Sequence, residues 1–388
     1  MKTVHRIFFQ NAKKMAALSN ESVALMVTSP PYPMIAMWDE LFVQMDRSIK
    51  KALRDGEAMT AFELIHHCLD PVWREVYRVL VPGGIACINI GDATRTIAGN
   101  FGLYPNHARI LSALVTIGFS PLPEILWRKQ TNAPNKFMGS GMLPPGAYVT
   151  LEHEHILILR KGAKREFATP EEKRNRQESA FFWEERNQWF SDVWMDLKGT
   201  TQRLIDNDAR QRSAAYPFEL PYRLINMFSV KGDLVLDPFL GTGATMAAAI
   251  AAGRDSVGFE LSSEFLTVIH NRIDTIVQFA NERIKERLAA HVEFVKERVR
   301  TNGPLKHRNE YYGFPVVTSQ EARLIINALQ KAEKINDTTI SIDYGKNPQP
   351  DFILKWEEPP ETGAGPGRPS GKKKAVPEKP SQQQLFGF

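Results

Sequence analysis

Cysteine is scarce in this 388-residue sequence: only Cys68 and Cys87 occur, and they have no paired spacing. This scarcity excludes a disulfide scaffold and a cysteine-based metal centre, so we expect no metal and a reducing cytoplasm. No run of about 18 apolar residues is present, which excludes a membrane-spanning helix. The first six residues also lack the apolar stretch of a secretory signal, and we therefore expect a cytoplasmic protein.

Net positive charge is small as well, +5 over the whole chain. Residues 363–388 contain five Lys and Arg against one Glu, which places +4 in this segment and leaves about +1 for the rest. The body is therefore not uniformly basic, and binding to DNA would need a local cationic face. Because residues 356–388 are rich in Pro, Gly, Lys and Gln, we predict a disordered basic tail there.

Apolar runs and helical patterns alternate along most of the chain. Residues 23–28 form a continuous apolar run that stops at two prolines, as in a strand buried on both faces. Residues 233–236 and 255–259 are also predicted to be strands, and a helical segment separates them. This βαβ order predicts an α/β fold around a mostly parallel sheet. Apolar residues at spacings of three and four between 284 and 299 predict that the region 276–355 is helical.

A glycine-containing loop follows the strand that ends at Leu236 and precedes an alanine-rich helix. This loop reads Asp237-Pro238-Phe239-Leu240-Gly241-Thr242-Gly243-Ala244-Thr245. Glycines at such a turn let the backbone approach a ligand closely, and Glu260 on the next strand can accept hydrogen bonds from ribose hydroxyls. A tight turn without a ligand is the alternative. Since Met246 replaces the last glycine of the dinucleotide pattern Gly-x-Gly-x-x-Gly, a nucleoside without phosphates fits better than a pyrophosphate cofactor.

A second loop, Ser29-Pro30-Pro31-Tyr32, ends the first of these buried strands. Two consecutive prolines remove two N–H donors and stiffen the backbone, which leaves carbonyl oxygens as acceptors. Ser29 and the carbonyl of Pro30 can accept the hydrogens of an exocyclic amine, while Tyr32 stacks on the base. The alternative is a polyproline turn packed by an aromatic ring, which would be preferred if the loop stood alone. Together with the glycine loop and Glu260, it favours methyl transfer to a base amine.

The two loops resemble those of the amino-methyltransferase family of DNA modification enzymes, and their order resembles its circularly permuted β group. The resemblance covers residues 1–275 and implies one catalytic domain of the Rossmann-like, S-adenosylmethionine-dependent type. Its mostly parallel sheet would have seven strands, followed by a helical C-terminal extension. The implied cofactor is S-adenosyl-L-methionine. The residues implied to bind it are Thr28, Asp237, Pro238, Phe239, Gly241, Thr242, Gly243, Thr245 and Glu260, and those implied to be catalytic are Ser29, Pro30, Pro31 and Tyr32.

The first residue of the catalytic loop indicates the target base. Within the family, Asp or Asn at this position is typical of N6-adenine enzymes and Ser of N4-cytosine enzymes. Ser29 therefore predicts methylation at N4 of a cytosine flipped out of the duplex, in a restriction–modification system. N6-adenine methylation, methylation of RNA or protein, and an inactive DNA-binding module are the alternatives. Methylation at cytosine C5 is rejected because it needs a cysteine nucleophile, and neither cysteine follows a loop proline.

Contacts to double-stranded DNA are expected near the catalytic face. Arg128, Lys129 and Lys136 are the predicted phosphate contacts, because they belong to a segment that is similar to the Trp-x-Lys motif of the family. The candidates for reading the DNA sequence are the insertions at 34–59, 132–148 and 160–200.

Two segments beyond the catalytic domain predict partners. Gln382, Leu385 and Phe386 resemble the short peptide by which bacterial proteins bind the replication sliding clamp, with these three side chains as anchors. The region 276–355 is a candidate dimer surface, so a homodimer is a second expectation. Binding to DNA would also place the protein at the nucleoid.

Overall fold

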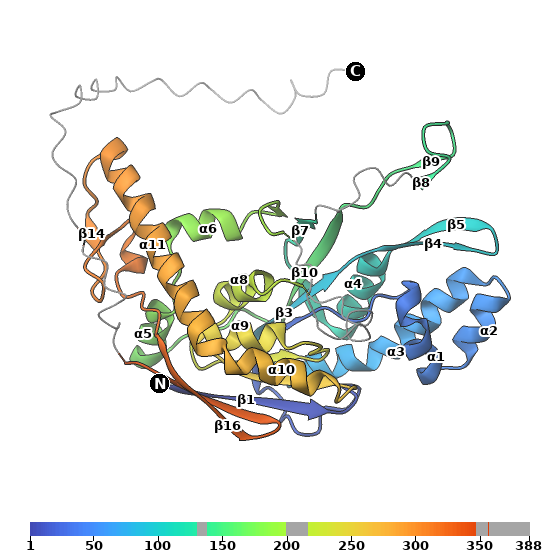
Figure 1. Cartoon of the computed structure of the whole chain (residues 1–388), viewed down its shortest axis with the longest axis horizontal. Coiled ribbons are helices and arrows are strands. Elements are labelled where there is room, and N and C mark those ends of the chain that lie inside the picture. Colours follow the sequence, from blue (N-terminus) through green and yellow to red (C-terminus); the bar gives the residue numbers. More distant parts are fainter. Residues whose placement is uncertain (130–137, 199–215, 347–355, 357–388) are drawn as a thin grey trace.

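The computed structural model of the chain describes residues 1–129, 138–198, 216–346 and 356. A large mixed β-sheet crosses the molecule and carries helices on both faces (Figure 1). Its strand order is β11-β7-β10-β3-β2-β12-β13-β1-β17-β16, and β6 pairs with β10. The strands of this sheet are β1 (Lys2–Phe9), β2 (Val23–Thr28), β3 (Leu80–Ile90), β6 (Phe119–Pro121), β7 (Ile125–Arg128), β10 (His153–Lys161), β11 (Val193–Trp194), β12 (Leu234–Asp237), β13 (Asp255–Glu260), β16 (Leu329–Asn336) and β17 (Thr339–Tyr344).

Five neighbouring strands, β3, β2, β12, β13 and β1, run parallel in the middle of the sheet. Leu236 of β12 lies opposite Met26 of β2, and Asp237 lies opposite Gly258 of β13. The carboxyl ends of these strands therefore meet at one edge, where ligands bind in open α/β folds. Both loops singled out in the sequence begin at this edge: the proline loop (residues 29–32) and the glycine loop (residues 237–245).

Helices cover both faces of the sheet. They are η1 (Ala36–Trp38), α1 (Asp39–Met45), α2 (Ser48–Arg54), α3 (Ala58–Val79), α4 (Asn106–Ile117), α5 (Pro170–Glu178), α6 (Trp183–Trp189), α8 (Glu219–Phe228), α9 (Ala244–Ala252), α10 (Phe265–Asp274), α11 (Ile276–Asn302) and η2 (Ser319–Glu321). Side chains alternate along each strand, so β3 sends Ile85 and Cys87 into one core and Ala86, Ile88 and Ile90 into the other. The first core includes α8 to α11, and the second includes α1 to α4 (Figure 1).

The predicted α/β fold with a mostly parallel sheet is confirmed, but within the described residues the sheet has eleven strands and not seven. The region 276–355 is also not helical throughout, because α11 ends at Asn302 and the hairpin of β16 and β17 follows. In β17, Ile340, Ile342 and Tyr344 alternate with polar residues, a period of two that suits a strand. The hairpin pairs antiparallel with β1 and so extends the sheet at that edge.

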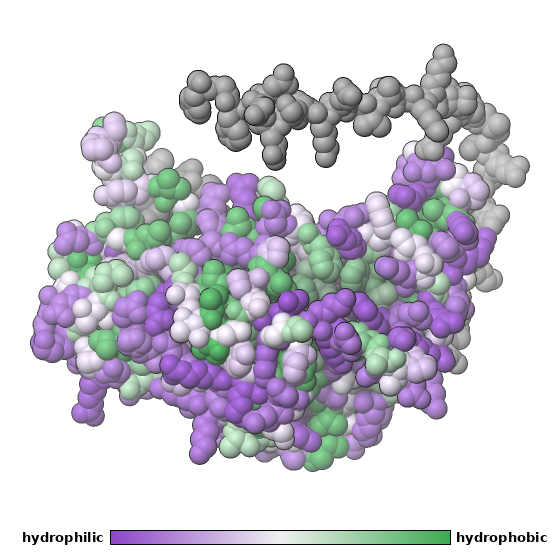
Figure 2. Space-filling model, turned by 180° about the vertical axis from the view of Figure 1, so that it is seen from behind, coloured by the Kyte–Doolittle hydropathy of each residue, from purple (hydrophilic) through white to green (hydrophobic). Residues whose placement is uncertain are grey.

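Two small hairpins project from the carboxyl edge of the sheet (Figure 1). Phe101 on one stacks on Tyr148 of the other, with ring centroids 4.5 Å apart, and so links them. Leu103, Met142 and Leu143 on the same projection are exposed. Hydrophobic groups are visible on the projection in the space-filling view (Figure 2). The hairpin strands are β4 (Ala93–Ile97), β5 (Asn100–Tyr104), β8 (Met138–Gly139) and β9 (Ala147–Tyr148), and a further pair beyond α11 is β14 (His307–Arg308) and β15 (Pro315–Val316).

Several predicted features lie outside the described residues. They are Lys136, the basic tail from residue 357 onward, and within that tail Gln382, Leu385 and Phe386. Clamp binding and dimer formation therefore stay predictions. In the part of the chain that the structure describes, no helix has the length and apolar character needed to cross a membrane.

Candidate active site

The glycine loop begins where β12 ends and turns the chain into α9. Gly243 precedes this helix with a φ of 77°, a left-handed conformation that suits glycine. A Cβ at this position would also lie 3.2 Å from the side chain of Ile269. At the start of the loop, Asp237 Oδ1 accepts hydrogen bonds from Thr28 Oγ1 (2.6 Å) and from the Phe239 N–H (3.1 Å). The carboxyl group thus joins the glycine loop to β2, the strand that leads into the proline loop.

Asp237 is only 3% exposed, and this burial controls its protonation. Loss of hydration destabilises the carboxylate and raises its pKa from 3.8 to about 6, although Thr245 and Thr28 oppose this by hydrogen bonding. Tyr216 Oη lies 3.4 Å from Asp237 Oδ2 and is also hydrogen-bonded to Thr245. A buried acid whose pKa is raised toward neutrality is typical of a functional site.

Glu260 shapes the turn beside the glycine loop. Its Oε2 accepts the N–H of Gly241 (2.8 Å), and its Oε1 accepts the N–H groups of Leu261 (2.8 Å) and Ser262 (3.0 Å). These bonds hold the loop after β12 against the end of β13. The residue also lines the cavity described below, where the remaining lone pairs of its carboxylate can accept ligand hydroxyls.

A network of hydrogen bonds holds the proline loop against neighbouring strands. Tyr32 Oη donates to Glu154 Oε2 (2.9 Å) and accepts from Asn89 Nδ2 (2.9 Å) and Ser29 Oγ (3.2 Å). Asn89 Nδ2 also donates to Glu154 Oε2 (2.7 Å), and Lys129 Nζ donates to Glu154 Oε1 (3.0 Å). Burial, followed by the charge of Glu154, raises the pKa of Tyr32 well above its usual value. Tyr32 is therefore a neutral phenol that is fixed in position on three sides.

The two loops share one cavity of about 310 Å³. Ser29, Pro30 and Pro31 line it together with residues 237–242 and Glu260. Residues between 37 and 45 also line the cavity, among them Trp38 with its indole ring. They belong to the insertion at 34–59, which is a predicted candidate for reading the DNA sequence. Segments that are far apart in the sequence therefore enclose a single space.

The chemistry of this lining fits S-adenosyl-L-methionine. Asp237, Glu260 and Glu40 are its acidic residues, and the described residues that line it include no Lys, Arg or His. A lining of this charge favours a cationic ligand such as a sulfonium and disfavours phosphate groups. Thr242 Oγ1 is buried without a hydrogen-bond partner, so it can serve the polar end of a ligand. Phe239 offers a flat apolar surface to an adenine ring.

The predicted cofactor and catalytic residues fall into two groups. Thr28, Tyr32, Gly243 and Thr245 do not line the cavity but support the residues that do. The predicted residues that line it are Ser29, Pro30, Pro31, Asp237, Pro238, Phe239, Gly241, Thr242 and Glu260.

The predicted DNA contacts have different surroundings. Arg128 forms an ion pair with Glu152 (3.1 Å) in which both side chains are exposed, so a phosphate can replace the carboxylate. Lys129 instead belongs to the network of the proline loop through Glu154. The insertion at 160–200 forms α5 and α6, and it packs against the C-terminal region where Glu185 pairs with Arg287.

Asn89 and Glu154 are site residues that were not among those predicted from the sequence. Asn89 interrupts the apolar run of β3 one residue before that strand ends, and Glu154 lies near the start of the apolar strand β10. A polar residue within a buried strand, close to the sheet edge where ligands bind, is the signal that could have found both.

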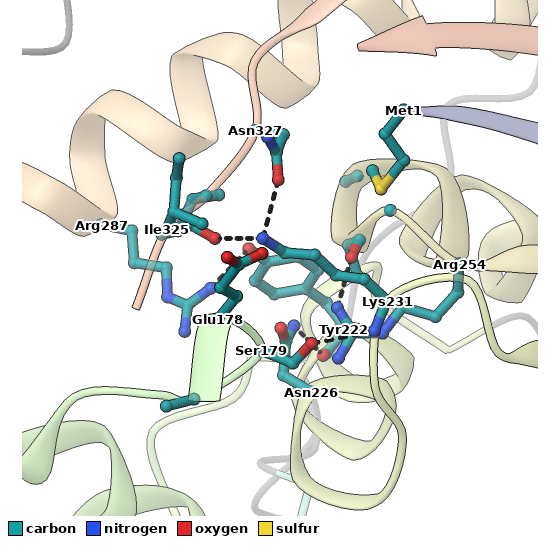
Figure 3. A pocket seen from close by; sticks show the side chains of 15 residues that line it. Met1, Glu178, Ser179, Tyr222, Asn226, Lys231, Arg254, Arg287, Ile325 and Asn327 are labelled. Carbon is teal, nitrogen blue, oxygen red and sulfur yellow. Dashed lines mark hydrogen bonds between the residues drawn. The ribbon is translucent and has the colours of Figure 1, made fainter. Parts of the chain in front are cut away.

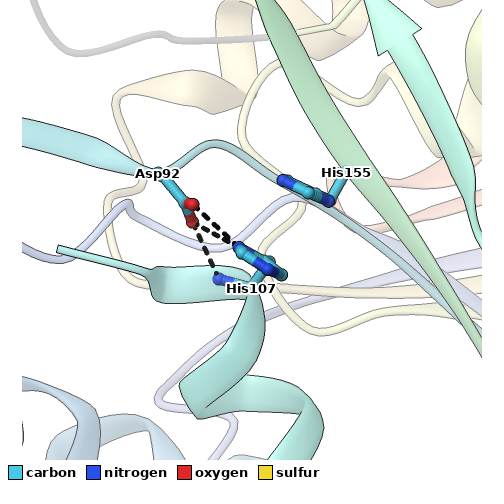
Figure 4. Close-up of side chains that lie close together, drawn as sticks. All are labelled: Asp92, His107 and His155. Atoms are coloured by element: carbon cyan, nitrogen blue, oxygen red, sulfur yellow. Dashed lines mark hydrogen bonds and ion pairs between the residues drawn. The ribbon is translucent and has the colours of Figure 1, made fainter. Parts of the chain in front are cut away.

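A separate cluster next to β3 contains Asp92, His107 and His155 (Figure 4). His107 Nδ1 donates to both carboxylate oxygens of Asp92 at 2.8 Å, and this raises the pKa of His107. Its ring stacks on His155 with centroids 3.8 Å apart and planes inclined by 8°. Burial, and then the charge of His107, lower the pKa of His155. Because the lone pairs of imidazole lie in the ring plane, two parallel rings do not converge on one metal ion.

A second cavity, of about 20 Å³, lies where the C-terminal region meets the loop after α8 (Figure 3). Lys231 Nζ donates there to the carbonyl of Ile325 (2.6 Å) and to Asn327 Oδ1 (2.7 Å). Burial, and then the charge of Arg254, lower the pKa of Lys231 to about 7. The cavity holds about one water molecule, so it is part of the packing and not a ligand site.

The fold and the shared cavity define an S-adenosylmethionine-dependent methyltransferase. Comparison with known proteins agrees, because the family model described as DNA methylase, which covers N6 and N4 enzymes, matches residues 23–271. The chain belongs to this DNA methylase family.

Relatives of the chain include archaeal type II methyltransferases. M.MthZI of Methanothermobacter thermautotrophicus is 52% identical over 345 residues, which cover 89% of this chain and 96% of the relative. M.MjaI of Methanocaldococcus jannaschii is 50% identical over 282 residues, 70% of this chain and 91% of the relative. Among solved structures, the Thermus thermophilus protein TTHA0409, determined in complex with S-adenosyl-L-methionine, is 33% identical with a TM-score of 0.53 and covers 69% of this chain and 94% of its own. The chain is thus a DNA methyltransferase that uses this cofactor.

Proposed function

We propose that the chain methylates the exocyclic N4 amino group of cytosine in DNA. The observation that carries this proposal is the shared cavity, which Ser29 and Pro30 line together with Asp237 and Phe239. Such a site can hold a methyl donor and an amine in line, and positioning of this kind supplies a large part of the rate. We also infer the circularly permuted order, because β2 with the proline loop precedes β12 with the glycine loop in the chain.

The proline loop suits an exocyclic amine, which is a weak nucleophile because its lone pair is delocalised into the ring. Ser29 Oγ and the carbonyl of Pro30 would accept its two hydrogens and so favour a pyramidal nitrogen with a localised lone pair. Tyr32 does not line the cavity, so we do not assign it the predicted stacking on the flipped base; its hydrogen bonds hold Ser29 in place instead. When bound, S-adenosyl-L-methionine supplies a methyl group whose bond to sulfur breaks as the bond to nitrogen forms.

N6-adenine methylation is the second candidate, because the family includes enzymes of both kinds. Ser29 favours cytosine over adenine, because within the family Ser at the first position of this loop is typical of N4-cytosine enzymes and Asp or Asn of N6-adenine enzymes. An inactive DNA-binding module is disfavoured because both loops are complete and line the same cavity. Relatives that are type II methyltransferases support a place for this chain in a restriction–modification system.

The projecting hairpins are the surface that we propose to face the duplex. They start at the strand ends that carry Asn89 and Glu154, next to the proline loop. Extrusion of a base leaves a gap in the duplex, and the stacked rings of Phe101 and Tyr148 can fill such a gap or cover its rim. Arg128 at the end of β7 can bind a phosphate on the same side.

Long-read modification mapping of DNA from cells that express the protein tests the proposed reaction. We expect N4-methylcytosine at one short sequence motif. N6-methyladenine at that motif would establish the second candidate, and no modification would contradict both. Ser29→Ala should lower methyl transfer by roughly 100-fold while cofactor binding is retained, because one acceptor of the amine is lost. Ser22→Ala, on the exposed turn before β2, is the matched control and should behave as the unaltered protein.

A further inference from the structure

Hydrogen-bond directions in the network around Tyr32 follow from the chemistry of its members. The carboxylate of Glu154 can only accept, and the amide nitrogen of Asn89 can only donate. The single proton of Tyr32 therefore points to Glu154, and its oxygen accepts from Asn89. Ser29 Oγ must then donate its own proton to the oxygen of Tyr32, 3.2 Å away.

This order leaves Ser29 with two lone pairs and no free proton. Because Ser29 lines the cavity, a base amine that enters would meet it as an acceptor only. A flipped amide of Asn89 would bring its oxygen against the carboxylate of Glu154, so the amide also fixes the direction of the chain. The network therefore both orients Ser29 and connects it to a carboxylate.

We propose that Ser29, Tyr32 and Glu154 form a relay that removes the proton released by the methylated amine. The inference rests on the proposed transfer to an exocyclic amine, and it holds for cytosine and adenine alike. Successive oxygens of the relay are 3.2 and 2.9 Å apart, within reach of proton transfer along hydrogen bonds. Glu154 acts through Tyr32 and does not touch the base, so it is a positioning residue and the final proton acceptor.

The protons balance within these three residues. The nitrogen uses its lone pair for the new bond to the methyl group and is left with one positive charge. It passes one proton to Ser29 Oγ, while the proton of Ser29 moves to Tyr32 and the proton of Tyr32 moves to Glu154 Oε2. At the end the amine, Ser29 and Tyr32 are neutral, and Glu154 is a neutral acid.

The far end of the relay is paired with the ammonium group of Lys129, whose side chain is partly exposed to solvent. Lys129 Nζ donates to the other carboxylate oxygen at 3.0 Å, and its side chain is 47% exposed whereas that of Glu154 is 13% exposed. The ammonium balances the charge of the carboxylate before transfer. Among the described residues bonded to Glu154, Tyr32 and Lys129 are the titratable ones, and Asn89 is neutral.

Single-turnover assays on the full chain, with saturating DNA and cofactor, test the relay. Glu154→Gln keeps the shape of the side chain but cannot take up the proton, so methyl transfer should slow by roughly 100-fold. Tyr32→Phe keeps the aromatic ring but lacks the relay hydroxyl, and we expect a comparable loss.

Glu152→Gln is the matched control, since it removes a carboxylate two residues earlier that pairs with Arg128 and not with Tyr32. It should keep the rate of the unaltered protein. Formate added to Glu154→Ala should restore part of the rate, and no restoration would count against the relay. An unchanged rate in Tyr32→Phe or in Glu154→Gln would overturn the relay. If the unaltered protein methylates no base, the proposed function fails instead.

Discussion

Among single residues, Asp237 is the one that couples the cofactor cavity to pH. Its buried carboxyl has a pKa of about 6 instead of 3.8, so between these values the folded protein holds a proton that the unfolded chain has released. The contribution of Asp237 to stability is therefore present at low pH and decreases as the pH rises through about 6. Above that pH the cavity gains a buried negative charge, which a cationic ligand would neutralise.

Cofactor binding should report this titration. We expect the affinity for S-adenosyl-L-methionine to fall several-fold as the pH decreases from about 7.5 to about 5, because protonation of Asp237 removes the charge that attracts a cation. Asp237→Asn should bind more weakly at neutral pH, with little change over this range. Isothermal titration calorimetry measures the affinity of the unaltered protein and of Asp237→Asn at each pH. Glu40→Gln, which removes another carboxyl from the cavity lining, is the control. A pH dependence that is the same in Asp237→Asn and the unaltered protein would contradict this account.

Individual elements differ in how far they could be predicted from the sequence. The proline and glycine loops could be predicted because each follows directly, in the sequence, the strand that it ends. Glu154 could not be placed at the site, because it reaches Tyr32 only through the pairing of β10 with β3, whose register is set by long-range contacts. The hairpin of β16 and β17 has a local signal in the alternation of β17, but its place in the sheet depends on pairing with β1 from the other end of the chain.

The projecting hairpins are the elements that we expect to contact DNA beside the target base. Phe101→Ala and Tyr148→Ala each remove one ring of the stacked pair, so each should weaken binding of a cognate duplex by about 1–3 kcal/mol. Cofactor affinity should not change, because neither ring lines the cavity. Fluorescence anisotropy with labelled duplex measures the effect.

Phe279→Ala provides the comparison for these hairpin variants. Phe279 is 43% exposed, similar to Phe101 and Tyr148, but it lies on α11. It should leave DNA binding unchanged. An equal loss in all three variants would mean that exposed aromatic surface in general, and not the hairpins, binds the duplex.

Over the whole molecule, positive charge is unevenly placed. Within the described part, several buried or partly buried arginines are committed to ion pairs, such as Arg287 with Glu185 and Arg283 with Glu219. Residues 363–388 carry four of the five net positive charges of the chain. Sequence-independent attraction to DNA depends on cations that neutralise phosphates and release counterions. We therefore expect that segment to supply much of the salt-dependent affinity.

Conversion of Lys372, Lys373 and Lys374 to Gln tests this distribution. If each lysine neutralises one phosphate, the slope of log K against log salt concentration should become shallower by up to about 2.7, because each contact contributes about 0.9. Affinity at low salt should fall with it. Methyl transfer at saturating DNA should persist, since these residues are remote in sequence from both loops of the site.

A second triple variant, which removes three lysines from the described body of the protein, distinguishes the position of the positive charge from its total amount. Lys296, Lys331 and Lys334 pair with Glu293, Glu333 and Asp274. Because their charges are already balanced locally, their conversion to Gln should leave the salt slope nearly unchanged. Equal changes in the two triple variants would mean that total charge decides binding. No change in the tail variant would assign the attraction to the body, and then the exposed pair of Arg128 and Glu152 beside the hairpins would be the first place to look.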